Sequence, residues 1–238
     1  MTEPIASPAP DAAPAEHRLV VVSAGTSDPS STRMLADRTA DAVAKRAAED
    51  GAAVRVDVIE LRRLTTEIGE ALTTHVPGPE LSRAIELLGD ADGLVVATPV
   101  YKADPSALLT AFFQVLDQDL LIGLPVVLTA TAGTQRHALV VDHQMRATFA
   151  YLRTFAVPTS LFAAPEDWQG GGLGKRVERA ALELWLLMRS GVQRQLREQS
   201  WSSYQHQFGS AGGTETGVDF SSDLMKLATG GSLPPLRK

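Results

Sequence analysis

Cysteine is absent from the 238-residue sequence, which excludes disulfide bonds, thiolate catalysis and metal sites built on cysteine. No apolar run reaches the ~18 residues of a membrane-spanning helix, and the start of the chain lacks the basic and apolar segments of a signal peptide. Positive charge is also scarce, because 22 Lys and Arg stand against 28 Asp and Glu. The net charge of −6 argues against binding to nucleic acid or to an anionic membrane surface. We therefore expect a cytoplasmic protein.

Several catalytic motifs are missing as well. The sequence has neither the G-x-G-x-x-G fingerprint of dinucleotide-binding folds nor the Gly-Lys-Ser/Thr of nucleoside triphosphatases, and it has no G-x-S-x-G serine nucleophile. The five histidines are scattered without the spacing of metal ligands, so no metal site is predicted. The chain thus offers no evident nucleophile or acid–base pair of its own.

The composition divides the chain into three parts. Residues 1–16 contain four prolines and five alanines and almost nothing to bury, which is typical of a disordered arm. Residues 17–201 alternate apolar segments with turns and are expected to form one domain. Residues 202–238 are rich in Gly, Ser and Thr and are predicted to be a mostly irregular tail.

Strands and helices alternate along the central part. Apolar or alternating segments predict five strands, at 19–24, 54–59, 93–97, 126–130 and 159–163. Helical spacing predicts the helices at 32–50, 80–88, 106–116, 137–154 and 176–199. This alternation indicates an α/β fold with a five-stranded parallel sheet between two layers of helices. The half-exposed second strand favours the order 2-1-3-4-5, and ligands of such folds bind beyond the carboxyl ends of the strands.

The loop after the first strand is rich in glycine and hydroxyl side chains. Seven such residues precede or begin a predicted helix: Ser23, Gly25, Thr26, Ser27, Ser30, Ser31 and Thr32. Free N–H groups at a helix start bind anions and hydroxyls can donate to phosphate, so the loop is predicted to cradle a phosphate. A helix cap on a polar loop is the alternative, and it accounts for only one or two of the hydroxyls.

The third and fourth strands end in residues suited to a flat ring. Pro99 ends the third strand, and Tyr101 and Lys102 follow with a planar face and a positive charge. Gly133 follows the fourth strand and allows the backbone to approach a ring closely. A strand-ending proline or an ordinary turn would explain either loop alone. Together with the phosphate cradle, the two loops predict a flavin site, because a bound flavin brings its own redox chemistry.

At these loops the sequence resembles the NAD(P)H-dependent FMN reductases, a flavodoxin-like family that includes the reductases of alkanesulfonate monooxygenase systems. The resemblance runs from Leu19 to Phe162 and is densest over residues 91–102, ADGLVVATPVYK. It implies a site with Thr26, Ser27, Ser31, Thr32 and Arg33 at the phosphate, with Pro99, Val100, Tyr101 and Lys102 in a first ring loop, and with Gly133, Thr134 and Gln135 in a second. Asp28 stands where many members have an arginine, so neutralisation of the phosphate is expected to depend on Arg33.

The resemblance implies an NAD(P)H:FMN oxidoreductase in which NADPH or NADH gives a hydride to N5 of FMN. Backbone donors near Lys102 and Thr134 would stabilise negative charge on the reduced ring, and no catalytic side chain is expected beyond an electrostatic role of Lys102. Reduced FMN would then leave and supply a flavin-dependent monooxygenase. Two apolar helices, at 107–116 and 138–154, predict a homodimer or homotetramer. Glycines at 170, 171, 172 and 174 favour a pliable segment that places Trp168 near the ring.

Three other functions stay open. A quinone, azo or chromate reductase with retained FMN would share the fold and the hydride step and would differ only in the acceptor. A flavodoxin-type electron carrier would usually be more acidic and carry aromatic residues on both faces of the ring, whereas only Tyr101 is a candidate here. A signalling domain without flavin would need an aspartate at the end of the third strand, where Thr98 and Pro99 stand.

Overall fold

A computed structural model describes residues 16–200, and its centre is a parallel sheet. The main strands are β1 (Glu16–Ser23), β2 (Ala53–Glu60), β3 (Gly93–Tyr101) and β5 (Pro125–Thr131), in the order β2-β1-β3-β5. The short β6 (Phe155–Ala156) and β7 (Leu161–Ala163) both pair with β5 in parallel, and β4 (Asp104–Pro105) is antiparallel to β3. The predicted fold class and the order of the first four strands are confirmed. The sheet has seven strands rather than the predicted five, because β6 and β7 share the place of the fifth strand and β4 is added beside β3.

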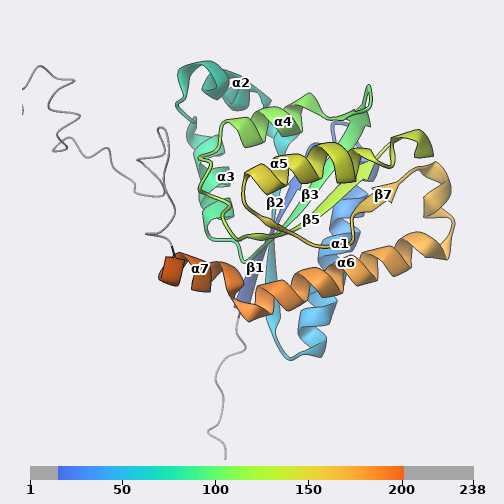
Figure 1. Ribbon diagram of the computed structural model, residues 1–238. Helices are drawn as coiled ribbons and strands as arrows, with labels where there is room; N and C mark the ends of the chain where they lie inside the picture. Colours follow the sequence, from blue (N-terminus) through green and yellow to red (C-terminus); the bar gives the residue numbers. More distant parts are fainter. Residues whose placement is uncertain (1–15, 201–238) are drawn as a thin grey trace, which may run out of the picture.

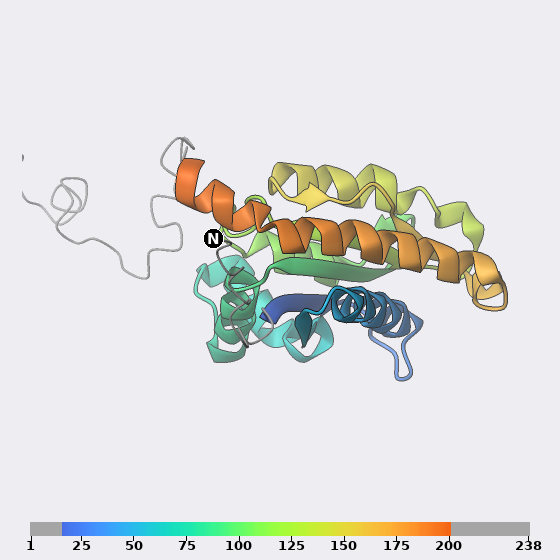
Figure 2. The ribbon, with the colours of Figure 1, turned by 90° about the horizontal axis from the view of Figure 1, so that it is seen from below.

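Two layers of helices cover the sheet (Figure 1). On one face, α1 (Ser31–Glu49) and α6 (Gly171–Ser190) pack side by side. The other face carries α2 (Thr65–Thr74), α3 (Pro79–Gly89), α4 (Ala107–Gln114) and α5 (Arg146–Tyr151). The last helix, α7 (Val192–Ser200), continues beyond the end of α6 (Figure 2). Within residues 16–200, none of the helices combines the length and the hydropathy needed to cross a bilayer.

The central strands are apolar along their length because both of their faces are buried. Successive side chains of a strand point to opposite faces, so Val20 and Val22 of β1 join the core cluster under α3, α4 and α5. Leu19 and Val21 of the same strand join the cluster under α1 and α6. This double burial leaves the polar residues of β1, β3 and β5 concentrated towards the strand ends.

Two of the predicted helices differ in the structure. The helix predicted at 137–154 is interrupted by a π-helical segment at Val141–Met145 before α5 begins. The helix predicted at 176–199 starts earlier and is closed by Gly191, whose φ of 63° is the left-handed conformation that glycine tolerates. The glycines predicted to be pliable therefore lie in the N-cap and first turn of α6, and Trp168 packs against the core cluster under that helix.

Two elements, α2 and β4, have no predicted counterpart. In α2 the apolar residues Ile68, Ala71 and Leu72 follow helical spacing over only ten residues, and this short helix was not predicted from the sequence. The predicted arm and tail lie outside the described residues, apart from Glu16, which is the first residue of β1. Near the C-terminal end of the described residues, Arg197 of α7 donates to the carbonyls of Gly89 and Leu120 at 3.2 and 2.8 Å.

Candidate functional site

The three predicted loops meet at the carboxyl edge of the sheet. β1, β3 and β5 are parallel neighbours, so the loops that follow them leave from adjacent positions. In the ladder, Ser23 is opposite Ala97, and Pro99 is opposite Thr131. The first two loops also touch, because the hydroxyl oxygens of Thr26 and Tyr101 lie 3.4 Å apart.

The phosphate loop ends at the start of α1. Ser30 is the N-cap of this helix, and its Oγ accepts a hydrogen bond from the N–H of Arg33 at 3.2 Å. Gly25 is required here, since a Cβ at this position would lie 2.1 Å from Ser30 Oγ. The first turn of a helix holds N–H groups without intrahelical acceptors, and the helix dipole makes this end attractive to anions. Three predicted residues are exposed around it: Thr26, Ser27 and Ser31.

The side chains of the other two predicted phosphate residues are engaged elsewhere. Thr32 is only 3% exposed, and its Oγ1 lies 2.7 Å from the Oγ1 of Thr131. Arg33 donates to Asp37 at 2.7 Å and to Glu60 at 2.9 Å, so two carboxylates already compensate its charge. What this loop offers an anion is therefore backbone N–H groups and exposed hydroxyls.

The first ring loop is a hairpin of β3 and β4. Tyr101 pairs with Asp104, and the two residues between them, Lys102 and Ala103, have φ values of 54° and 67°. Tyr101 and Lys102 are exposed, whereas Pro99 is half-buried and Val100 is buried in the core. The hairpin therefore presents a planar ring and a cation at its tip.

The second ring loop is held by a carboxylate that sequence reasoning missed. The side-chain amide of Gln135 donates to Asp167 Oδ2, which also accepts from the N–H of Ala164 at 2.9 Å. Arg176 of α6 donates to Asp167 Oδ1 at 3.0 Å. Gly133 and Thr134 are exposed, and no heavy atom would lie within 4 Å of a Cβ on Gly133. The backbone of this loop is thus open to a flat group.

The residues at this edge suit FMN. An anion-attracting helix start, an exposed aromatic ring and an open glycine lie on three adjacent loops, as a phosphate joined to a planar ring system requires. Thr131 and Asp167 complete the edge, although the sequence analysis did not predict them as site residues. Ser30, one of the seven residues of the predicted cradle, is the cap of α1. A polar threonine at the end of a buried strand was a signal available for Thr131. The contact of Asp167 depends on packing between distant segments.

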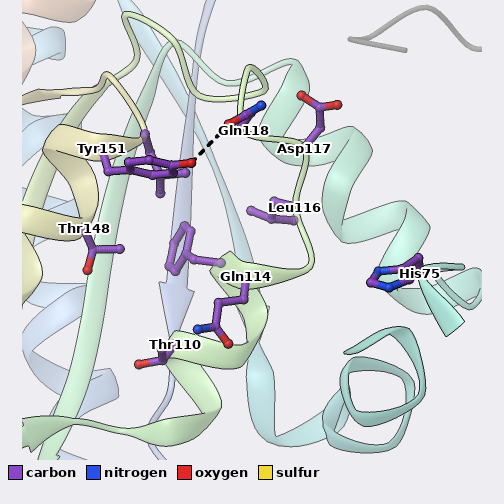
Figure 3. Close-up of a pocket in the computed structure, with 10 residues that line it drawn as sticks. His75, Thr110, Gln114, Leu116, Asp117, Gln118, Thr148 and Tyr151 are labelled. Carbon is purple, nitrogen blue, oxygen red and sulfur yellow. Dashed lines mark hydrogen bonds between the residues drawn. The ribbon is translucent and has the colours of Figure 1, made fainter. Parts of the chain in front are cut away.

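Two cavities lie elsewhere, in a groove between α4 and α5. One of about 750 Å³ is lined by residues that include Thr110, Gln114, Thr148 and Tyr151 (Figure 3). The Tyr151 hydroxyl donates to Gln118 Oε1 at 3.2 Å across its end. The other, of about 620 Å³, extends this groove to the hairpin residues Asp104 and Pro105. Neither cavity is lined by any of the twelve predicted flavin residues.

Comparison with known proteins decides the family. Residues 17–169 match the family described as NADPH-dependent FMN reductase. The chain belongs to this family. It is 36% identical over 153 residues to an FMN reductase (NADPH) of Pseudomonas aeruginosa, covering 63% of this chain and 78% of that protein. It is 35% identical over 149 residues to the NADH-dependent FMN reductase SfnE of Pseudomonas putida, covering 63% and 77%.

Solved structures share the fold of this chain. An oxidoreductase from Corynebacterium diphtheriae superposes with a TM-score of 0.71 at 44% identity, over 73% of this chain and 97% of that one. The apo form of the NADH:FMN oxidoreductase EmoB has the same fold, with a TM-score of 0.62 at 24% identity, over 71% and 89%. The predicted family, enzyme class and cofactors, FMN with NADPH or NADH, are confirmed at the level of the family.

Proposed function

We propose that this chain is an NAD(P)H-dependent FMN reductase that supplies reduced FMN to a flavin-dependent monooxygenase. The observation that carries the proposal is the family match over residues 17–169, which spans all three loops at the carboxyl edge. The open backbone at Gly133 in the second ring loop favours a flavin that binds and leaves.

Each loop has a separate task in this proposal. The start of α1, with Ser27 and Ser31, binds the phosphate through backbone N–H groups and hydroxyls. Tyr101 and the backbone at Gly133 and Thr134 orient the ring. Bound FMN supplies the hydride acceptor. Lys102 and nearby N–H groups stabilise the negative charge that arises on reduction, so no side chain needs to act as acid or base.

Steady-state oxidation of NADPH and NADH tests the proposal, with free FMN compared against quinones as acceptors. We expect the protein to lose FMN on dialysis and its turnover to saturate with added FMN. Stoichiometric flavin retained through gel filtration, with faster turnover of quinones, would support a quinone, azo or chromate reductase instead. Flavin binding without oxidation of either nucleotide would support an electron carrier.

The predicted homodimer or homotetramer also belongs to this proposal. The groove between α4 and α5 is open, and Tyr151, which lines it, is 71% exposed; Leu139, which precedes α5 in the sequence, is 65% exposed. A second copy of the chain would cover these side chains. Light scattering at micromolar concentration tests it, and a monomer would contradict it. The cytoplasmic location and the place of Trp168 near the ring stay predictions.

A further inference from the structure

Thr131 occupies the point where the three loops of the site meet. It is the last residue of β5, so the second ring loop begins at the next residue. In the sheet it is opposite Pro99 of the first ring loop and Ala163 of β7. Its side chain crosses to the first turn of α1, where its Oγ1 lies 2.7 Å from Thr32 Oγ1.

Solvent water cannot take over the hydrogen bond between the hydroxyls of Thr32 and Thr131. Thr32 and Thr131 are 3% and 4% exposed, so each hydroxyl depends on protein partners for its hydrogen bonds. The two residues are 99 positions apart in the sequence. Their contact therefore fixes the first turn of α1, and with it the backbone N–H groups offered to a phosphate, relative to the second ring loop.

A second threonine on the same strand shows what the pairing adds. Thr129 lies two residues before Thr131, so both side chains face the same side of the sheet. Thr129 is also fully buried, yet its Oγ1 has no hydrogen-bond partner. The strand thus holds one buried hydroxyl that is bonded to α1 and one that is not. A valine at either position keeps the shape of the side chain and removes only the hydroxyl.

We propose that Thr131 is a positioning residue for FMN: through Thr32 it keeps the phosphate-binding turn in register with the second ring loop. The inference rests on the proposed function, because it assumes that these two loops hold the two ends of one cofactor. Loss of the contact lets the start of α1 shift against the ring loop. The phosphate and the ring can then no longer be satisfied at the same time.

Four variants test this proposal: Thr131→Val, Thr131→Ser, Thr32→Val and Thr129→Val. The FMN dissociation constant is measured by fluorescence titration of each purified protein, next to its melting temperature and the KM values for FMN and NADPH. We expect Thr131→Val to raise the dissociation constant and KM for FMN about tenfold, the loss of roughly one hydrogen bond. The KM for NADPH, and kcat at saturating FMN, should change less than about twofold.

The control variants distinguish the loss of the hydrogen bond between Thr131 and Thr32 from a change in side-chain packing. Thr131→Ser keeps the hydroxyl and should restore FMN affinity, and Thr129→Val should leave it unchanged. Thr32→Val removes the same contact from the other side, so the double valine variant should bind FMN no more weakly than either single variant. If Thr131→Val fails to fold, Thr32→Val carries the test alone.

Two results would overturn the inference: wild-type FMN affinity in the folded Thr131→Val and Thr32→Val variants, or an equal loss in Thr129→Val. Failure of the wild-type protein to bind FMN would instead overturn the proposed function, so the two failures are distinguishable.

Discussion

The two ring loops reach the same edge of the sheet by different means. The first is shaped by its backbone, as a hairpin whose turn residues Lys102 and Ala103 both have positive φ. Within residues 16–200, the only side-chain hydrogen bond to these two turn residues runs from the Gln144 amide to the Ala103 carbonyl at 3.2 Å. The second loop is held by side chains, through Gln135 on Asp167 and through Thr131 on Thr32.

This difference predicts that the first ring loop changes its conformation more easily than the second. Two-residue hairpins of this kind favour Asn-Gly, because ordinary side chains are strained at positive φ. With Lys102 and Ala103 in these positions, the first loop stores strain at an exposed tip, and a ligand can reshape it at low cost. The Asp167 carboxylate, in contrast, accepts hydrogen bonds from three different segments. We infer that the second loop is preformed and that the first one adapts.

The largest expected effect comes from removing the carboxylate that holds the second loop. Asp167→Ala removes the acceptor of the Gln135 amide and of the Ala164 N–H, and it leaves Arg176 with only the carbonyl of Phe162. Because these groups are part-buried or exposed, we expect the free energy of unfolding to fall by no more than about 2–3 kcal/mol, with weaker FMN binding as a consequence. Urea denaturation and FMN titration measure the two effects.

Glu166 provides the matched control for this prediction. It is the neighbouring acid, it is exposed, and it makes no hydrogen bond or ion pair within the described residues. Glu166→Ala should therefore change the free energy of unfolding by less than about 0.5 kcal/mol. Similar losses in the two variants would show that the second loop is not held by Asp167.

The sequence predicts those parts of the fold that depend on local periodicity. The helix at 32–50 and the buried strands are present within a few residues, because repeated apolar side chains set both their type and their faces. The hairpin was not predicted, since Lys102 and Ala103 are not turn-forming residues. The interruption at Val141–Met145 has no local signal that we could identify.

The candidate site was predictable as a set of loops but not as a set of contacts. Strand ends identify the loops, because parallel topology brings them to one edge. The Ser30 cap is a local contact that a serine before a predicted helix already suggests, but local sequence does not tell that Thr32 faces inward to a threonine on another strand. That contact follows from packing of α1 on the sheet, which periodicity alone cannot specify.

Glycine is expected to stabilise the first loop and to destabilise the second, so a change to glycine in the first loop and a change from glycine in the second should both raise stability. Ala103→Gly relieves a strained φ of 67°, which outweighs the greater entropy of the unfolded chain, and we expect a gain of about 0.5–1 kcal/mol in stability. Gly133 has an ordinary φ and open space around it, so the reverse change, Gly133→Ala, should also stabilise by about 0.5 kcal/mol.

The two variants should also differ in their affinity for FMN. Gly133→Ala should weaken FMN binding, because the added methyl group occupies the space offered to the ring. Ala103→Gly should change FMN affinity little, since the hairpin keeps its ladder to β3. Thermal melts and FMN titrations check both statements. A loss of stability in Ala103→Gly would contradict the idea that the first loop is strained.

The smallest expected effect is a loss of stability at acid pH. It arises at Asp142, in the segment that supports the hairpin. Asp142 lies in the π-helical segment with Gln144, and its Oδ1 accepts from Ser160 at 2.6 Å and from Arg146 at 3.1 Å. Burial acts to raise the pKa of Asp142, but these hydrogen bonds and the charges of Arg146 and His143 oppose it, so the pKa is lowered below its usual value.

The sign of the pH dependence follows from this lowered pKa. The unfolded chain binds the proton first, so the contribution of Asp142 is fully present above its unfolded pKa of about 4 and is lost as the pH falls through the lower folded value. Melting temperatures of wild type and Asp142→Asn should thus differ by a constant amount from pH 5 to 7 and converge below about pH 4. The gap should be small, because the carboxylate is half-exposed, and Ser160→Ala should narrow it further. A gap that closes already near neutral pH, or persists unchanged at pH 3, would show that Asp142 does not stabilise the support of the first loop.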